Sequence, residues 1–471
     1  MTGNYSDGNR IIGDDERGPD GPIQCTPTEA CIDGSCCNKD GKCGYRSVHC
    51  APDICISNCD AKAMCGVDSK DGNKKCGLNL CCSYYGWCGV DQIHCGDKDE
   101  EGFDTPCQDG FGGCQVKPSP SCGAGSGTAS NGRKIGYWQS WNVRQRACNR
   151  IMPDQIVTDG FTHLYFAFAS IDPNTYNIRT YHSDDERLFP LFTALKTDKM
   201  QTWIAIGGFD FSDPGPTHTT WSDMCSTQDS RAAFITSLVQ FMDKWGFQGI
   251  DLDWEYPASD VRGGREEDTQ NLVSLVKEMR EAFGTTYGIS SILAPDYWYL
   301  RGFDPKGMEP YVDWFGFMAY DLHGAWDVNV KALGAQIRPQ TDARDIDKGL
   351  VPLWFDELDP AKVNFGLAYY GRGYTAEKTD CLYFGCPFTG PSNKAPCTNF
   401  DGVMSNREMQ AVIDSTGIRP ELIADAMVQQ IAWDDQWIGY DDPGTIAMKM
   451  GLANDRCMGG TMVWSVDFDS G

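Results

Sequence analysis

The chain has 471 residues, more than one hydrophobic core of ordinary size contains, so we expect one large domain with small modules attached. Hydrophobic residues make up 41% and aromatic residues 12% of the sequence, which excludes a disordered chain. The formal net charge of -26 argues against nucleic acid or an anionic membrane as the partner. Because no run of eighteen apolar residues occurs, we expect no membrane span.

The N-terminal residues 1–24 are polar and rich in glycine and aspartate. They lack the apolar stretch of a signal peptide, and we expect them to be a disordered lead-in. A leader that has already been removed, or a fragment boundary, would explain why no signal peptide is visible in this chain.

Cysteine is the most informative feature of the composition. Of the 23 cysteines, 16 lie between Cys25 and Cys114, in a segment with few aliphatic residues that needs covalent cross-links to fold. Disulfides imply an oxidising compartment, so we expect a secreted protein in the extracellular space or the cell wall. The alternative is zinc, but zinc ligands usually come as C-x2-C pairs and none occurs, so we expect no metal.

The number of cysteines is odd, so at least one thiol is unpaired or pairs outside this chain. Residues 115–132 are rich in proline, serine and glycine and predict a flexible linker. Cys122 lies in this linker and is our candidate for the unpaired thiol.

The cysteine-rich region contains the same spacing twice. The pattern C-x4-CC-x5-C-x6-C begins at Cys31 and again at Cys76, with one cysteine before each copy and two after it. Two eight-cysteine modules are therefore predicted, over residues 25–59 and 60–114. Eight cysteines allow 105 pairings, so the spacing alone does not determine which disulfides form.

The second copy resembles a hevein-type chitin-binding module through its core sequence CCSYYGWCGVDQIHC. In that family the cysteines pair first with fourth, second with fifth, third with sixth and seventh with eighth, and a serine and three aromatic residues hold N-acetylglucosamine. The cysteines concerned are Cys65, Cys76, Cys81, Cys82, Cys88, Cys95, Cys107 and Cys114. The sugar-binding positions match Ser83, Tyr85, Trp87 and His94, with His94 where the family prefers tyrosine.

An exposed aromatic ring suits this role, because a sugar has an apolar face of C–H groups that stacks on it. A module this small has no core for Tyr85 and Trp87 to fill, so we expect both to be exposed; the alternative is that they pack against the disulfides. In the first copy Asp40 and Lys42 occupy these two positions. We interpret that degenerate copy as structural, or as a binder of something else.

From Lys134 onward, short apolar strands alternate with helical stretches. Several strands are almost continuously apolar, as strands buried on both faces are. Eight such units in about 340 residues predict an α/β fold, a (β/α)8 TIM barrel over residues 133–471, with a small α+β subdomain inserted at 374–448. The eight strand-like runs are residues 134–141, 162–168, 201–208, 247–255, 287–295, 312–320, 362–371 and 459–468.

The fourth strand ends in three alternating carboxylates, Asp251, Asp253 and Glu255, and chemistry in such barrels lies at the C-terminal strand ends. Because strand side chains alternate, the three share one face while Leu252 and Trp254 point to the helices. Like charges buried together must share protons. A purely structural cluster would need neighbouring cations, and none is adjacent in sequence. A metal site is the better alternative, but carboxylates at three depths along one strand suit a proton relay better than a coordination sphere.

This strand resembles the signature DG-x-D-x-D-x-E of family 18 glycoside hydrolases over residues 248–255. Gln248 replaces the first acidic residue, at the position furthest from the sugar, and Ala205 stands where serine is usual. Further motifs of the family end three other strands: Ile206-Gly207-Gly208, Met318-Ala319-Tyr320-Asp321 and Trp464. The resemblance covers residues 134–471. Together with the hevein-like repeats, it resembles fungal chitinases related to the chitinase subunits of killer toxins.

The resemblance implies a retaining, substrate-assisted mechanism. Glu255 would protonate the leaving oxygen while the substrate's own 2-acetamido group attacks the anomeric carbon, giving an oxazolinium ion. Asp253 would hold the acetamide N–H, Asp251 would share a proton with Asp253, and Tyr320 would donate to the acetamide oxygen. The alternative for Tyr320 and Trp464 is a place in the barrel core. The substrate-binding residues implied are Trp464 beneath the −1 sugar, Asp321, Met318, Tyr137, Phe209, Trp326 and Arg372.

We therefore predict a chitinase that hydrolyses β-1,4 links between N-acetylglucosamine units. It would act as a monomer on chitin and its oligomers, with no cofactor and no nucleic acid or membrane partner. Two alternatives share parts of the pattern. A chitin-binding lectin that has lost catalysis would lack the terminal glutamate, and Glu255 is present. An endo-β-N-acetylglucosaminidase acting on glycoproteins would share the barrel and the mechanism, but the chitin-binding module and the insertion favour a polymer.

Overall fold

The computed structural model describes residues 25–469 apart from 27, 32, 99–101, 103, 331 and 332. The expected disordered segment 1–24 lies outside the described residues. The chain divides into two compact units, with residues 120–347 and 359–469 in the larger and residues 25–119 and 348–358 in the smaller. Within the described ranges, no helix combines the length and the apolar character that crossing a membrane requires.

Two small disulfide-rich modules make up most of the smaller unit. Each contains a pair of very short antiparallel strands followed by one turn of helix. The first module has β1 (Cys36–Asn38), β2 (Cys43–Gly44), α1 (Ser47–Cys50) and β3 (Cys55–Ser57). The second has the 3-10 turn η1 (Gly77–Asn79), β4 (Cys81–Cys82), β5 (Cys88–Gly89) and α2 (Gln92–Cys95).

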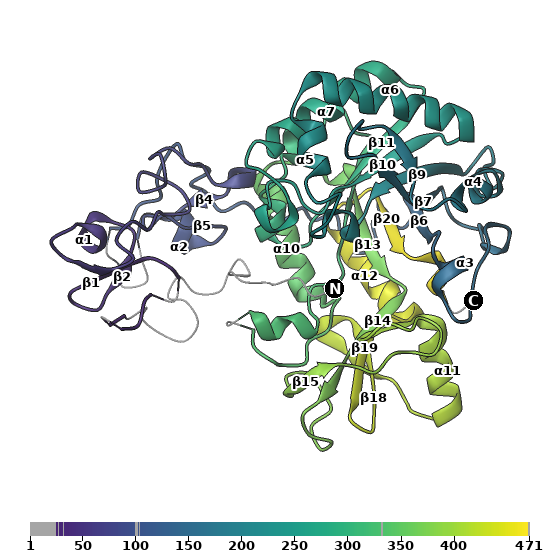
Figure 1. Ribbon diagram of the computed structural model, residues 1–471. Helices are drawn as coiled ribbons and strands as arrows, with labels where there is room; N and C mark the ends of the chain where they lie inside the picture. Colours follow the sequence, from purple (N-terminus) through teal and green to yellow (C-terminus); the bar gives the residue numbers. More distant parts are fainter. Residues whose placement is uncertain are drawn as a thin grey trace. The chain divides into compact units, whose positions relative to one another are not determined.

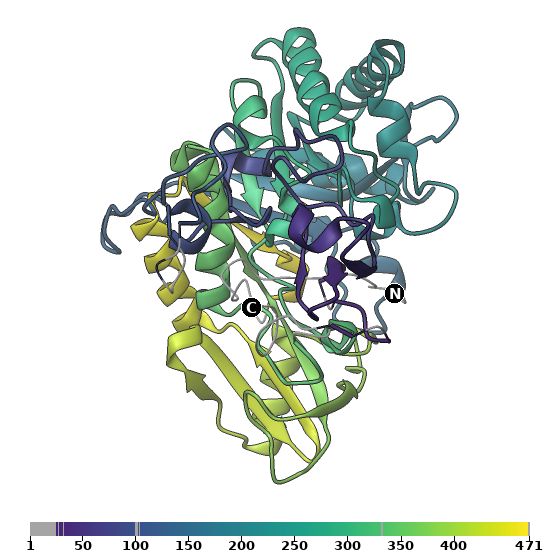
Figure 2. The ribbon, with the colours of Figure 1, turned by 90° about the vertical axis from the view of Figure 1, so that its left-hand side faces the viewer.

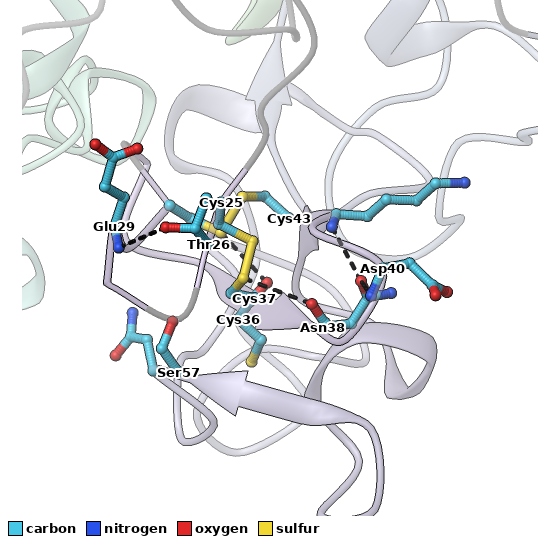
Figure 3. Close-up of a disulfide and its surroundings, with 12 residues drawn as sticks. Cys25, Thr26, Glu29, Cys36, Cys37, Asn38, Asp40, Cys43 and Ser57 are labelled. Atoms are coloured by element: carbon cyan, nitrogen blue, oxygen red, sulfur yellow. Dashed lines mark hydrogen bonds between the residues drawn. A yellow bond between two sulfur atoms is a disulfide. The ribbon is translucent and has the colours of Figure 1, made fainter.

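The disulfides of both modules follow the pairing that the hevein resemblance implies. The second module contains Cys65–Cys82, Cys76–Cys88, Cys81–Cys95 and Cys107–Cys114. The first contains Cys25–Cys37, Cys31–Cys43, Cys36–Cys50 and Cys55–Cys59. Beside the Cys25–Cys37 bond, Asn38 accepts hydrogen bonds from the backbone N–H groups of Asp40 (3.0 Å) and Lys42 (2.9 Å) (Figure 3). Asp40 and Lys42 are both exposed, so charged groups stand where the second module has Tyr85 and Trp87.

The larger unit is a closed barrel of eight parallel strands, as the sequence predicts (Figure 1). In spatial order the strands are β6, β20, β13, β12, β11, β10, β9 and β7, and pairing of β7 with β6 closes the barrel. Each strand overlaps one of the eight predicted runs, and most of its residues are buried, as in a sheet covered on both faces. The strands are β6 (Arg133–Gln139), β7 (His163–Ile171), β9 (Gln201–Gly207), β10 (Gly249–Asp253), β11 (Gly288–Leu293), β12 (Trp314–Phe317), β13 (Val363–Ala368) and β20 (Gly460–Trp464).

Helices connect the barrel strands and lie outside them (Figure 1). In α6, Thr227 caps the first turn by accepting a hydrogen bond from the Ser230 N–H, and Gly246 (φ 81°) ends the helix in the left-handed conformation that favours glycine. The longer helices are α4 (Asp185–Thr193), α5 (Thr220–Cys225), α6 (Gln228–Trp245), α7 (Asp268–Phe283), α10 (Ala343–Phe355) and α12 (Pro443–Asp455). Shorter elements are α3 (Asn142–Gln145), η2 (Pro153–Gln155), β8 (Ile178–Thr180), η3 (Phe209–Ser212), η4 (Asp260–Arg262), α8 (Tyr297–Leu300), α9 (Pro305–Met308), η5 (Ala325–Asn329), η6 (Pro360–Lys362) and η8 (Val466–Phe468).

The insertion between β13 and β20 is a six-stranded antiparallel sheet with helix α11 packed on it. Both views show its strands gathered in one sheet apart from the barrel strands (Figures 1 and 2). Its last strand ends at Tyr440, before the end of the range 374–448 that was predicted for the subdomain. The sheet stops there because Asp442 and Pro443 already begin barrel helix α12. Its elements are β14 (Tyr370–Ala376), β15 (Phe388–Pro391), β16 (Val403–Ser405), α11 (Asn406–Thr416), β17 (Glu421–Ile423), η7 (Ala424–Ala426), β18 (Val428–Trp433) and β19 (Gln436–Tyr440).

The prediction that Cys122 is the unpaired thiol is wrong. Cys122 forms a disulfide with Cys457, just after α12, and the side chain of Asp455 accepts a hydrogen bond from the neighbouring Gly123 N–H (3.1 Å). Residues 120–132 therefore belong to the barrel unit and are not a free linker. The free thiol is Cys225, buried in α5, where a thiol behaves as a small apolar side chain. The remaining disulfides are Cys148–Cys397 and Cys381–Cys386.

Candidate active site

Strand β10 places three carboxylates in a row that leads to the C-terminal end of the barrel. Asp251 and Asp253 lie within the strand and Glu255 follows it, and their exposed fractions are 1%, 4% and 9%. Trp254 faces the helices instead, where its ring stacks on a tryptophan of α5 at 5.5 Å between centroids. On the neighbouring strand, a Cβ at Gly207 would lie 2.3 Å from the Asp253 carbonyl oxygen, so only glycine fits there.

Asp251 is the deepest of the three carboxylates and is held by two hydroxyl groups. Its Oδ2 accepts a hydrogen bond from Tyr137 and its Oδ1 one from Ser290, both at 2.7 Å. Ser290 also shares a hydrogen bond with the Tyr165 hydroxyl (3.0 Å), which in turn accepts one from the Trp314 Nε1–H group (2.9 Å). Tyr137, expected to bind substrate, is 2% exposed and its hydroxyl is used by Asp251.

Ser290 and Tyr165 are site residues that sequence reasoning missed. Ser290 pairs in register with Asp251 on the adjacent strand β11, so its side chain lies at the same level of the barrel. A signal was present, because a serine inside an apolar strand buried on both faces needs a hydrogen-bond partner there. Tyr165 pairs in register with Tyr137, which places a second hydroxyl at the next strand.

Burial raises the pKa of all three carboxyl groups. The pKa of Asp251 is raised to about 6, with the hydrogen bonds from Ser290 and Tyr137 opposing the rise. For Asp253, burial and then the charges of Glu255 and Asp251 raise the pKa well above its ordinary value. Burial raises the pKa of Glu255 to about 7, although the charge of a nearby arginine lowers it. Near neutral pH the group therefore holds protons and shares them between neighbouring carboxyls.

Arg262 is that arginine, and it is a further site residue that was not predicted from the sequence. Its Nε donates a hydrogen bond to the backbone oxygen of Glu255 (3.1 Å), and its Nη1 pairs with Asp213 at 2.6 Å. The guanidinium carbon also lies 3.8 Å from the centre of the Phe209 ring. One buried side chain thus fixes the backbone of Glu255 and the ring of Phe209. It comes from the loop after β10, where no motif or periodicity marks it.

Strand β12 leads to Met318 and Tyr320, which are 7% and 8% exposed. Burial raises the pKa of Tyr320 well above its ordinary value, and the charges of Asp253 and Glu255 raise it further. The hydroxyl of Tyr320 therefore stays protonated and is available as a hydrogen-bond donor beside the carboxylates.

Asp321 and Trp326 lie on the loop after β12 and form one cluster with Arg372 of the inserted sheet. Asp321 adopts a left-handed conformation (φ 59°), which aspartate tolerates better than most residues. Its carboxylate accepts hydrogen bonds from Arg372 Nε (2.6 Å) and Nη2 (2.7 Å), and from the hydroxyl of Tyr370 (2.5 Å). The guanidinium carbon of Arg372 lies 4.5 Å from the centre of the Trp326 ring. The inserted sheet, which supplies Tyr370 and Arg372 from β14, thereby holds the loop after β12.

His323 anchors the same loop through two carboxylates. It is 2% exposed, its Nδ1 lies 2.9 Å from Asp327 Oδ2, and its Nε2 lies 3.4 Å from Asp345 Oδ2. Although burial lowers it, hydrogen bonds to these two carboxylates raise the pKa of His323 to about 9. The imidazole is therefore a buried cation at neutral pH, between Asp321 and Trp326 in the chain.

Trp464, at the end of β20, lies within a group of aromatic rings. Its ring centre is 5.5 Å from that of Tyr137, 5.7 Å from Phe168 and 6.0 Å from Trp141. Phe168 and Trp141 also stack on each other at 5.8 Å. These two residues were missed, although each is the last residue of a predicted strand run and so lies at the C-terminal end of the barrel.

In the second module, the four expected sugar-binding residues divide into accessible and buried ones. Tyr85 is 37% exposed, and Trp87 is half-buried. Ser83 is 1% exposed, and its Oγ accepts a hydrogen bond from the Trp87 backbone N–H (3.2 Å). His94 is 8% exposed, with its Nδ1 2.7 Å from Asp91 Oδ1. The accessible part of this surface is therefore aromatic.

Cysteines come close enough together to hold a metal ion at three places in the described chain. All of these cysteines are in disulfides, in the groups Cys25, Cys31 and Cys37; Cys65, Cys76 and Cys82; and Cys31 and Cys43 with Asp33. The thiolate is the form of cysteine that binds metal. The cysteines of these three groups form disulfides instead, so they are not in the form that binds zinc.

The model of glycosyl hydrolases family 18 matches residues 133–469, which is the whole of the barrel with its insertion. The chain belongs to this family. Its barrel is a glycoside hydrolase domain of the chitinase type. The family's fungal members include proteins similar to this one, in agreement with the resemblance drawn from the sequence.

Three relatives illustrate the similarity. Chitotriosidase-1 of Mus musculus is 27% identical over 72% of this chain and 74% of its own length. Secreted chitinase LysM12 of Penicillium expansum is 28% identical over 72% of this chain, and the killer toxin subunits alpha/beta of Kluyveromyces lactis are 30% identical over 61% of it. The chain spans only 23% and 25% of these two fungal proteins.

Solved structures share the fold of this family 18 domain. Catalytic domain 2 of the Group II chitinase of Ostrinia furnacalis superposes with a TM-score of 0.65 at 24% identity, over 72% of this chain and 90% of that chain. Human YKL-39, described as a pseudo-chitinase, superposes with a TM-score of 0.62 at 22% identity, over 72% of this chain and 93% of that chain.

Glu255→Gln should stabilise the folded protein, most strongly above pH 7. Folding raises the pKa of Glu255 from 4.5 to about 7, so the ionised side chain is disfavoured in the folded state. The stability that this group contributes is present below about pH 4.5 and is lost as the pH rises through about 7. We expect the variant to gain on the order of 1–3 kcal/mol in free energy of unfolding at pH 8 and little at pH 4, measured by denaturant titration.

Glu408→Gln is the matched control, because Glu408 is also buried but its pKa moves the other way. Burial raises the pKa of Glu408, but hydrogen bonds from Thr398, Ser405 and the Cys397 backbone lower it overall. This variant should lose stability at pH 8. If Glu255→Gln lost stability at pH 8 as well, the raised pKa of Glu255 would be contradicted.

Proposed function

We propose that this protein is a chitinase that hydrolyses the β-1,4 links between N-acetylglucosamine units. The observation that carries the proposal is Glu255, a buried carboxyl at the C-terminal end of a barrel strand, with a pKa raised to about 7. Such a group holds a transferable proton near neutral pH, which is what a general acid requires. Relatives named as chitinases support this substrate class, as does the Ostrinia furnacalis catalytic domain 2, a variant of which was solved with penta-N-acetylchitooctaose (NAG)5.

The reaction that we propose retains configuration and uses the substrate's own acetamide group. Glu255 gives its proton to the leaving oxygen as the bond from that oxygen to C1 breaks. The acetamide carbonyl oxygen forms a bond to C1 and yields an oxazolinium ion. Water then attacks C1 as the bond from the acetamide oxygen to C1 breaks, which restores the acetamide, and the water gives a proton back to Glu255. The acid is thereby regenerated and no redox step occurs.

Asp253 is suited to stabilise the oxazolinium ion. Its Oδ1 is buried and has no hydrogen-bond partner among the described residues, so it is available to accept the acetamide N–H. Asp251 accepts hydrogen bonds from two hydroxyl groups, which stabilise a negative charge on its carboxylate. That charge, deeper in the barrel than Asp253, favours the positively charged intermediate. Tyr320, whose hydroxyl stays protonated, would donate to the acetamide oxygen.

The substrate would lie across the C-terminal end of the barrel. Trp464 would support the −1 sugar from its place in the aromatic group. The side chain of Asp321 remains 40% exposed despite its bonds to Arg372, so one carboxylate lobe can also accept a sugar hydroxyl. Phe209 and Trp326 would flank the product side, each with its ring held against an arginine.

The second cysteine module would hold the enzyme on insoluble chitin through Tyr85 and Trp87. The eleven disulfides among the described residues require an oxidising compartment, which favours the extracellular space. We propose the chitin-containing cell wall as the place of action, with the protein acting as a monomer.

Glu255→Gln should abolish hydrolysis, because an amide has the same shape and no transferable proton. Loss of a general acid is worth ~10²–10⁴-fold in rate. For the unmodified enzyme, kcat should fall as the pH rises through about 7, where Glu255 loses its proton. Product chromatography with chitin oligomers and with a high-mannose glycopeptide measures both effects and the substrate class. The exposed Glu281→Gln is the control, and near-native turnover by Glu255→Gln would remove Glu255 from the role of acid.

The first product formed should be the β-anomer, and cleavage should need an acetamido group at the −1 sugar. Attack by the acetamide and then by water inverts C1 twice, which retains the configuration. Rapid NMR of fresh products identifies the anomer, and fully deacetylated chitosan tests the acetamide. An initial α-anomer, or chitosan cleavage at a comparable rate, would exclude the oxazolinium route.

Trp87→Ala should weaken retention on insoluble chitin several-fold and leave hydrolysis of soluble oligomers unchanged, because stacking on this ring is lost while the barrel is untouched. Sedimentation with chitin beads measures retention, and oligomer turnover measures the barrel. The matched control is Val67→Ala, an exposed apolar residue of the same module. Unchanged retention would mean that the module does not bind chitin through this surface.

A further inference from the structure

The two cysteine modules contact each other through Tyr45 and Arg46 of the first module. The guanidinium carbon of Arg46 lies 3.8 Å from the centre of the Tyr84 ring, and its Nη1 donates a hydrogen bond to the Tyr84 carbonyl oxygen (2.7 Å). Its Nε lies 3.9 Å from Asp68 Oδ2, a buried atom without a hydrogen-bond partner among the described residues. The rings of Tyr45 and Trp87 meet edge to face, 5.2 Å apart. These contacts join the modules at the predicted sugar-binding surface.

The two copies of the repeat differ at the position of Arg46. In the second copy the equivalent residue is Asp91, which caps α2 by accepting hydrogen bonds from two backbone N–H groups and binds the ring of His94. Arg46 makes no side-chain cap on α1, and the buried Nδ1 of His49 has no hydrogen-bond partner among the described residues.

The two copies are otherwise packed alike at this point. The ring of His49 lies against Gly44, where a Cβ would be 2.5 Å from its Nδ1, and the ring of His94 lies against Gly89 in the same way, 2.2 Å from its Cγ. The difference between the copies is therefore the residue at the helix cap. An arginine there leaves the helix end uncapped and directs its charge onto the neighbouring module.

Tyr45 is positioned to extend the aromatic surface. It stands one residue before Arg46, at the position where the second copy has Val90. Its hydroxyl donates to the Asp33 carbonyl oxygen (3.1 Å), which fixes the ring, and the side chain is half-exposed. The half-exposed rings of Tyr45 and Trp87 thus meet across the two modules, and the exposed ring of Tyr85 packs edge to face on Tyr84, the residue that Arg46 contacts.

We propose that the two modules form a single chitin-binding surface, in which Tyr45 of the degenerate first module supplies an additional platform for an N-acetylglucosamine unit and Arg46 holds the modules in register. The proposal rests on the proposed chitin-binding role of Trp87. It assigns the first module a part in sugar binding that its own frame does not suggest, since Asp40 and Lys42 occupy its stacking positions. A β-1,4-linked N-acetylglucosamine oligomer is the ligand, because stacking rings suit the apolar faces of successive sugars.

The test measures binding of the full chain to insoluble chitin in the Glu255→Gln background, so that the polymer is not consumed. Tyr45→Ala should raise the dissociation constant ~3–10-fold, as loss of one stacking contact does, while Tyr45→Phe keeps the ring and should bind like the parent. Arg46→Asp should weaken binding similarly, because it opposes Asp68 while restoring the capping residue that the second copy has, so the module itself is not destabilised. Val48→Ala, an exposed apolar truncation in the first module, is the matched control.

The outcomes separate the two proposals. If Trp87→Ala weakens binding and Tyr45→Ala does not, the shared surface is overturned and the second module binds alone. If Tyr45→Ala tightens binding, Tyr45 covers Trp87 and competes with the sugar, which also overturns it. If Trp87→Ala itself has no effect, the proposed chitin-binding role fails together with this inference. The thermal unfolding midpoint should be the same in all variants, which shows that a change in binding is not a general folding defect, and Val48→Ala with Glu255 intact should turn over soluble oligomers like the parent.

Discussion

Burying three carboxylates side by side in a protein interior is the constraint on which this barrel depends. Each charge is expensive to remove from water, and each raises the cost of ionising the next. The barrel offsets this cost with different partners at different positions. Two hydroxyl groups donate hydrogen bonds to Asp251, and a buried arginine donates one to the backbone oxygen of Glu255. Asp253 keeps one oxygen that has no hydrogen-bond partner in the described part of the chain. The result is a set of carboxyls whose pKa values are all raised, including that of Glu255, the one nearest the barrel mouth, which is raised to about 7.

The elements outside the barrel serve the same site. The inserted sheet contributes Tyr370 and Arg372, which bind Asp321. A buried imidazolium, His323, anchors the loop after β12 that carries Asp321. These contacts hold polar and aromatic groups at the rim in fixed positions, which is what orientation of a substrate requires. A disulfide from Cys122 joins the chain before the first barrel strand to the segment before the last, so the barrel is closed covalently as well as by strand pairing.

The N-terminal modules solve a different problem, since they have too few apolar residues for a core. Disulfides replace the core, and this frees surface positions to change without loss of the fold. The two copies have the same pairing but carry charges in one and aromatics in the other at equivalent positions. The arginine at the helix cap of the first copy shows the same freedom, because the module tolerates an uncapped helix turn and uses the side chain to contact its neighbour.

The local sequence pattern was sufficient to predict the barrel, the cysteine repeat and the three carboxylates in a row. Alternation along one strand determines that Asp251, Asp253 and Glu255 share a face, and apolar runs of suitable length determine eight buried strands. Cysteine spacing revealed two modules but could not exclude Cys122 as the odd thiol, because its partner Cys457 lies 335 residues away. Tertiary structure alone decided which groups surround the acids: Arg262 and Ser290 are brought there by loop path and strand register, which depend on contacts between distant segments and leave no periodic trace in sequence.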